Sequence, residues 1–213
     1  MRRKLDPRVD ALFVEGTDDG AFINALVKAR LNIDLATRPY LVRTREDGGG
    51  DTWALAEFDN YVARAPAHAR VGLVVDRDSN ENDKWHPVRE RLAKLGLRAD
   101  QPSVDGAIAQ SRFGIWLWPD NVRHGDLETV LEEIIPKSPL LDHARDASRV
   151  AKMSHGAEYE EKDERKATLK IRSLWLNASR AGGYGHLIRE LPMTETPASK
   201  AFLDWFSRLF LTE

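Results

Sequence analysis

Residues 71–78, VGLVVDRD, are an apolar run with the length of a strand that ends directly in two carboxylates, Asp76 and Asp78. Residues 11–19, ALFVEGTDD, show the same pattern, with Glu15 directly after the apolar run. Apolar runs without alternation are typical of strands that are covered on both faces, as in parallel sheets. We therefore predict an α/β fold in which the acids after these strands meet at one edge of the sheet.

The apolar spacing elsewhere extends this alternation of strands and helices. Further strands are predicted at residues 39–43 and 113–118, in addition to those at 10–14 and 70–75. Apolar residues at helical spacing predict helices at residues 18–31, 53–62, 84–95 and 125–135, the first with Thr17 as its N-cap. This order predicts βαβ units and a mostly parallel four-stranded sheet flanked by helices.

The strand pattern stops after about residue 138. Helices are predicted at residues 140–153, 164–176 and 199–210 from the spacing of their apolar residues. We therefore expect an α/β core over residues 8–136 and a helical C-terminal extension over residues 137–213 that packs on the core.

Composition excludes several kinds of site. The chain of 213 residues contains no cysteine, which excludes disulfides, thiolate zinc sites and cysteine nucleophiles. Its six histidines lack the close spacing of a zinc site. The net charge of −2 favours no partner class, and no apolar stretch follows the basic start, so we expect a cytoplasmic protein without a membrane partner.

The first two acidic groups predict a metal site. Several carboxylates in one small site raise one another's pKa and repel, and a hard cation such as Mg²⁺ resolves this conflict. Gly16 lets the chain turn so that Glu15 and Asp19 can face the same crevice. The alternatives are ordinary ones: Asp19 can simply favour a helix N-terminus, and Asp76 and Asp78 can belong to an acidic turn.

Later residues add acids and bases. Asp126 and Glu128 follow the fourth predicted strand, where acids also suit the first turn of a helix. Basic residues gather over residues 162–172 and can meet phosphates, although a solvated helix face gives the same pattern.

The motifs Glu15-Gly16-x-x-Asp19 and Asp76-x-Asp78 together resemble the Toprim domain. That domain occurs in topoisomerases, bacterial primases, recombination and RNA-maturation proteins, and the overcoming-lysogenization-defect nucleases. The later part is most similar to small standalone Toprim-like proteins akin to that last group, through the stretches at residues 116–121, 125–128, 166–176 and 202–210.

The resemblance implies a Rossmann-like core and a nuclease site with Mg²⁺, replaceable by Mn²⁺, as two ions. Glu15 would bind metal and assist proton transfer, and Asp76 and Asp78 would hold Mg²⁺. Further ligands and a lysine would complete the site: Asp19, Glu128 with Asp126 as its neighbour, and Lys170 or, failing that, Lys166.

The expected function is metal-dependent cleavage of phosphodiester bonds in nucleic acid, with DNA favoured, as the effector of an anti-phage defence system. Nucleases of the resembled group usually carry a fused ATPase half, which this chain lacks, so the resemblance leaves room for a separately encoded ATPase subunit. The alternatives are a nuclease specific for tRNA or ribosomal RNA, and a non-catalytic subunit that binds nucleic acid or a partner. The sequence does not determine the oligomeric state, and it allows an oligomer.

Overall fold

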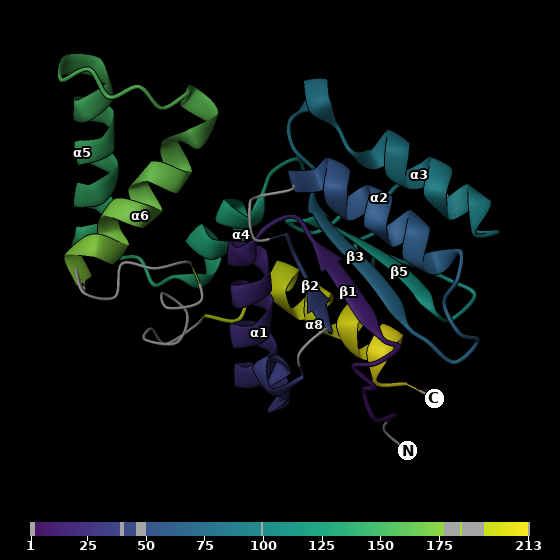
Figure 1. Ribbon diagram of the computed structural model, residues 1–213. Helices are drawn as coiled ribbons and strands as arrows, with labels where there is room; N and C mark the ends of the chain where they lie inside the picture. The colour runs from purple at the N-terminus through teal and green to yellow at the C-terminus, as the bar shows by residue number, and fades with distance from the viewer. Residues whose placement is uncertain are drawn as a thin grey trace.

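Strands and helices alternate through the first part of the chain (Figure 1). The computed structural model describes residues 3–38, 41–45, 50–98, 100–176, 184 and 194–212. The strands are β1 (Ala11–Val14), β2 (Val42–Arg43), β3 (Val71–Asp76), β4 (Ala107–Ala109) and β5 (Phe113–Trp118). The α-helices are α1 (Thr17–Leu31), α2 (Gly50–Val62), α3 (Trp85–Lys94), α4 (Leu127–Ile134), α5 (Pro139–Ser154), α6 (Glu164–Leu176) and α8 (Pro197–Phe210). Short 3-10 helices cover Leu35–Thr37, Asn80–Asn82 and Glu161–Asp163.

The strands form one five-stranded sheet in the order β2-β1-β3-β5-β4. The first four strands are parallel, and β4 pairs with β5 in the antiparallel direction. The predicted α/β fold with a mostly parallel sheet is confirmed, but the predicted number of four strands is wrong. β4 has only three residues, too few for an apolar pattern to reveal it. β2 falls within the strand predicted at residues 39–43, whose positions 39 and 40 lie outside the described residues.

Both faces of the sheet are covered, which explains why its central strands are apolar without alternation. Residues 71–75 of β3 are all buried, and successive side chains point to opposite faces. One face packs against α2 and α3 through a core that includes Phe13, Leu73, Val75, Phe58 and Val88. The other face packs against α1, α4 and α8 through a core that includes Val74, Trp116, Phe22, Leu131 and Phe206.

Helix α8 lies directly on the sheet, and two glycines make room for it. A Cβ added at Gly72 of β3 would stand 3.2 Å from the ring of Phe210, and one at Gly114 of β5 would stand 2.9 Å from the ring of Trp205. Such approaches are shorter than ordinary van der Waals contact. The extension predicted over residues 137–213 therefore has two parts, since α8 forms a layer of the core itself.

Helices α5 and α6 are the other part, and they pack against each other to one side of the sheet (Figure 1). Their link to the rest of the fold includes contacts between α6 and α4. Within the part of the chain that the structure describes, no helix is both long and apolar enough to cross a membrane.

Candidate functional site: an acidic cluster at the sheet edge

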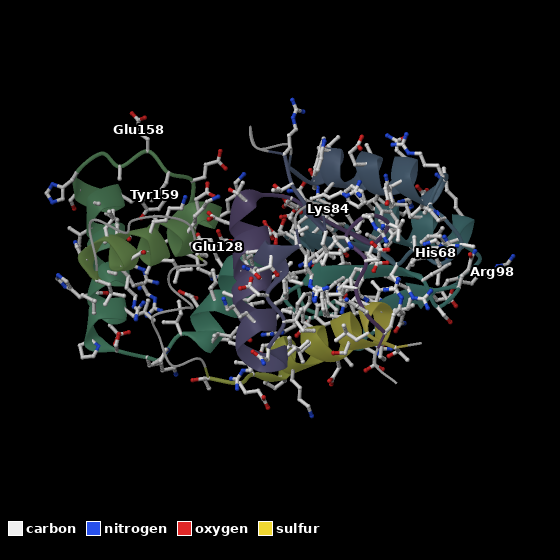
Figure 2. The ribbon with its side chains drawn as sticks, turned by 60° about the horizontal axis from the view of Figure 1, so that its bottom comes forward. His68, Lys84, Arg98, Glu128, Glu158 and Tyr159 are labelled. Atoms are coloured by element: carbon white, nitrogen blue, oxygen red, sulfur yellow. The ribbon has the colours of Figure 1, made fainter. Side chains whose placement is uncertain are left out.

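Four carboxylates come together at the C-terminal edge of the parallel strands. Glu15 follows β1, Asp76 ends β3, Asp19 lies in the first turn of α1, and Glu128 lies in the first turn of α4. Figure 2 shows Glu128 in the region where α1, α4 and α6 meet. We call these residues the inner cluster. Their convergence follows from the parallel topology, which brings the ends of β1 and β3 and the helices that follow to one edge.

Backbone hydrogen bonds hold two members of the inner cluster in place. The Asp76 N–H donates to Oε1 of Glu15 over 2.8 Å, and the Leu127 N–H donates to Oδ1 of Asp76 over 2.9 Å. These bonds connect the end of β1 to the end of β3, and the end of β3 to the start of α4. Both carboxylates are half-buried, so their positions are set by the fold and not by surface motion.

The other two members are buried, each with 8% of its surface exposed. Oδ2 of Asp19 accepts a hydrogen bond from the Gly16 N–H over 3.2 Å, while its buried Oδ1 has no hydrogen-bond partner among the described residues. Oε1 of Glu128 accepts a hydrogen bond from the Tyr184 hydroxyl over 2.8 Å. Gly16 occupies the N-cap position of α1, so the predicted N-cap Thr17 is wrong: it is the first helical residue and contributes no cap.

The inner cluster is short of positive charge. Burial, followed by the charges of Asp19, Asp51 and Asp78, raises the pKa of Glu15 to about 8 despite the opposing hydrogen bond from Asp76. Burial and then the charge of Glu128 raise the pKa of Asp19 to about 7.

The pKa values of Asp76 and Glu128 move in the same direction. Burial raises the pKa of Asp76 well above its usual value, and the charges of the other inner-cluster members raise it further. Burial also raises the pKa of Glu128, whereas the Tyr184 hydrogen bond and the nearby Lys166 act to lower it. Each of the four acids is thus destabilised in its charged form by the fold and its neighbours.

Asp78 lies outside the inner cluster because the chain turns after β3. Its φ angle is 64°, and its backbone pairs with Gly125 in both directions, at 2.9 and 3.0 Å. β3 ends at Asp76, so Asp78 does not extend the strand and the two carboxylates after the apolar run do not share one position at the sheet edge. The Asp78 side chain is 40% exposed and lies 3.5 Å from Nζ of Lys84, which also pairs with Asp51.

Asp126 is held by two other groups. Its Oδ1 accepts hydrogen bonds from the Thr129 N–H and hydroxyl, at 2.8 and 2.7 Å, as the N-cap of α4. Nη1 of Arg165 pairs with the same carboxylate at 3.1 Å. Asp126 is thus a helix-capping residue with a salt bridge, which leaves it less available as a ligand than the four inner acids.

A cleft of about 750 Å³ opens between this edge of the sheet and α6. Asp76, Asp78, Asp126 and Glu128 line it on the sheet side. On the helix side the lining includes five basic residues, Arg145, Arg149, Lys162, Arg165 and Lys166, of which Lys162 pairs with Glu160 at 2.9 Å. The three arginines form salt bridges with Glu132, Glu164 or Asp126, whereas the exposed Lys166 has no such partner among the described residues. Lys170 is exposed and does not belong to the lining that the described residues form.

With the geometry in place, comparison with known proteins gives the family. A model described as "Protein of unknown function (DUF3226)" matches residues 9–211. The chain belongs to this family. No curated protein and no solved structure matches the chain. The matched range takes in both parts of the DUF3226 fold, the α/β core and the α5–α6 pair.

The inner cluster of this DUF3226 protein has the chemistry of a site for a hard cation, but not a preformed set of ligands. All of its donors are carboxylate oxygens, which Mg²⁺ and Mn²⁺ prefer, and the buried Oδ1 of Asp19 has no hydrogen-bond partner in the described ranges. In the described part of the chain, no three His, Asp or Glu side chains stand close enough together to hold a metal ion as they are. The donor set thus fits a cation, provided that the side chains draw together around it.

Sequence reasoning missed three residues at this site. Lys84 and Asp51 come from the starts of α3 and α2 and form the ion pair that reaches Asp78. Tyr184 comes from 56 positions beyond its partner Glu128. No local pattern marks these residues, because their roles depend on contacts between elements that are distant in the sequence. The sequence does place Lys84, a basic residue, directly before α3 in the segment that follows β3. That position was the one sign that Lys84 could reach the acids at the end of β3.

Proposed function

We propose that this DUF3226-family protein is a Mg²⁺-dependent nuclease that cleaves phosphodiester bonds, with DNA as the favoured substrate and Mn²⁺ as a substitute ion. The observation that carries the proposal is the inner cluster, four acids whose pKa values are raised by burial and by neighbouring carboxylates at the edge of the sheet. Two of them, Asp76 and Glu128, line the cleft. We also propose that the core is a Toprim domain, which the motifs at Glu15 and Asp76 support.

The residues that would hold the ions differ in how available they are. Glu15, Asp19, Asp76 and Glu128 form the primary ligand set, because binding a cation would relieve their mutual repulsion. A second ion would depend on Asp78 and Asp126, which line the same cleft. Asp78 already pairs with Lys84, and Asp126 already pairs with Arg165, so these ion pairs must break before the two carboxylates can bind an ion.

Bound Mg²⁺ would supply electrostatic activation of water and stabilisation of the leaving oxygen. The chain's own contribution begins with Lys166. Its ammonium group lines the cleft, forms no salt bridge with a described residue and can stabilise negative charge on a phosphate. Glu15 is the candidate for proton transfer, because its pKa of about 8 lies near neutrality. Asp76 acts as a positioning residue as well as a ligand, since its N–H holds Glu15 and its carboxylate holds the start of α4.

The test combines cleavage and metal binding. Wild type is incubated with supercoiled plasmid, linear duplex DNA, tRNA and ribosomal RNA in Mg²⁺, Mn²⁺ or EDTA, and Mg²⁺ binding is measured by calorimetry. Glu15→Gln and Asp76→Asn are expected to lose at least about 100-fold in cleavage rate, in line with removal of a group that stabilises the transition state. Asp142→Asn, at a carboxylate on α5 that is 68% exposed, is the matched control and should cleave like wild type.

The outcomes separate the candidate functions. No cleavage with either metal, together with no heat of metal binding, refutes the nuclease proposal. Cleavage of tRNA or ribosomal RNA alone identifies the RNA-specific alternative. Tight binding of nucleic acid that survives EDTA, without cleavage, identifies a non-catalytic binding subunit. A separately encoded ATPase partner and a role against phage are further proposals from the Toprim resemblance, tested by co-purification and by plaque counts with Glu15→Gln as control.

A further inference from the structure

A second cavity lies on the opposite side of β5 from the strands that carry the inner cluster. It has a volume of about 340 Å³, which is within the lower range of small-molecule sites. Ile115 and Leu117 of β5, Val88 of α3 and Ala107 of β4 contribute apolar walls, and Trp85 adds an aromatic side chain. The cavity exists because β4 is shorter than β5 and pairs only with residues 113–115.

Asn121 closes the edge of β5 where β4 ends. The Leu117 N–H donates to Oδ1 of Asn121 over 2.7 Å, and the Asn121 N–H donates to the Leu117 carbonyl oxygen over 2.7 Å. Asn121 thereby replaces the missing strand partner of Leu117. This geometry uses the side-chain oxygen and fixes the orientation of the amide group.

The other half of that amide has no partner. Asn121 lines the cavity and is only 4% exposed, and its buried Nδ2 makes no hydrogen bond with any residue that the structure describes. Buried donors without a partner are rare in folded proteins and costly to leave unmet. At the rim, the exposed Arg208 of α8 lines the same cavity, and its guanidinium donates to the Asp105 carbonyl oxygen.

We propose that this cavity binds a small, largely apolar molecule of about the size of an aromatic ring that carries a carbonyl acceptor. The carbonyl oxygen accepts the hydrogen bond from Nδ2 of Asn121, and the ring lies between Val88, Leu117 and Trp85. Because Nδ2 is buried, binding includes a small shift of the lining side chains that opens this donor to the cavity. The lining also contains the polar residues Gln101, Ser103 and Asp105, so an ordered water that bridges Nδ2 of Asn121 to one of them is the competing occupant. The proposal is independent of the nuclease proposal, since it uses none of the inner cluster.

Acetophenone and toluene test this, because they share a ring and differ in the carbonyl group. Each is titrated into ¹⁵N-labelled protein, and the signals of the Asn121 side-chain amide and the Trp85 indole are followed by NMR. The amide signals of Asn121 are identified by their loss in Asn121→Asp, which keeps the oxygen that accepts from Leu117 and removes the donor. We expect acetophenone to shift both signals and to bind about threefold to tenfold more tightly than toluene, the usual net effect of one hydrogen bond.

Two kinds of variant make the result decisive. Asn121→Asp should reduce acetophenone binding to the level of toluene, and Leu97→Trp, which fills the cavity from a half-buried position, should weaken both ligands. Leu95→Trp, at a half-buried position that is not part of the lining, should leave binding unchanged. The proposal is overturned if acetophenone shifts neither signal up to its solubility limit, or if it binds Asn121→Asp as tightly as wild type.

Discussion

Replacing Asp19 with asparagine tests whether the inner cluster stores electrostatic repulsion. Burial and the charge of Glu128 raise the pKa of Asp19 from 3.8 to about 7, a difference of about three pH units that corresponds to roughly 4 kcal/mol. An asparagine keeps an oxygen for the Gly16 N–H and carries no charge. We therefore expect Asp19→Asn to have a higher free energy of unfolding than wild type at pH 8 in EDTA, by up to about 4 kcal/mol.

The pH dependence follows from the sign of the shift. Below about pH 3, the carboxyl is largely protonated in both the folded and the unfolded chain, so wild type and variant should differ little. Between about pH 4 and 7 the unfolded chain releases the proton first, which lowers the stability of wild type as the pH rises. Glu15, with a pKa of about 8 in the folded state, extends this loss of stability towards pH 8.

Urea-induced unfolding, followed by tryptophan fluorescence at pH 4.5 and pH 8, measures both effects. Mg²⁺ at ten times its dissociation constant should stabilise wild type by about 1.4 kcal/mol and should stabilise Asp19→Asn less. Asp142→Asn, at an exposed carboxylate, should change the stability by less than about 0.5 kcal/mol at either pH. The reasoning is refuted if wild type in EDTA is as stable at pH 8 as at pH 4.5, or if Asp19→Asn is no more stable than wild type at pH 8.

Three further predictions concern the cleft lysine and the packing of α8. Lys166→Ala should lower the rate of DNA cleavage at least about tenfold, because Lys166 lines the cleft. Lys170→Ala should not, because Lys170 does not belong to the lining that the described residues form, and equal effects would contradict this assignment. Trp205→Ala should lower the free energy of unfolding by about 3–5 kcal/mol in urea titrations, since the fully buried ring packs 5.8 Å from that of Trp116. Gly114→Ala should lower the free energy of unfolding by about 1–3 kcal/mol in the same assay, because the added methyl group would overlap the Trp205 ring. An unchanged urea midpoint would show that α8 can shift to make room.

The sequence predicts the parts of this fold that depend on local pattern. The apolar runs of β1, β3 and β5 identify the parallel sheet, and the position of Glu15 and Asp76 directly after two of these strands places both at one edge. β4 is not predicted, because its three residues form a strand through pairing with β5 and show no apolar pattern of their own.

The remaining site features depend on tertiary contacts. Asp78 takes a left-handed conformation because its backbone pairs with Gly125, which no spacing rule anticipates. From the sequence, Asp126 is predicted to lie near a metal site. In the structure Arg165 of α6 donates a hydrogen bond to it, and this contact joins residues 39 positions apart. The contact of Tyr184 with Glu128 is of the same kind.

The position of α8 has a consequence for how the chain folds during synthesis. β5 is complete about halfway through synthesis, but the face of the sheet that carries Trp116 and Trp118 is covered by Phe202 and Trp205, which leave the ribosome more than 80 residues later. Until then an aromatic surface at the centre of the sheet stays open to other chains and to chaperones. Nascent chains stalled before residue 197 should therefore be recognised by chaperones that bind exposed aromatic segments, and chains extended past α8 should be released.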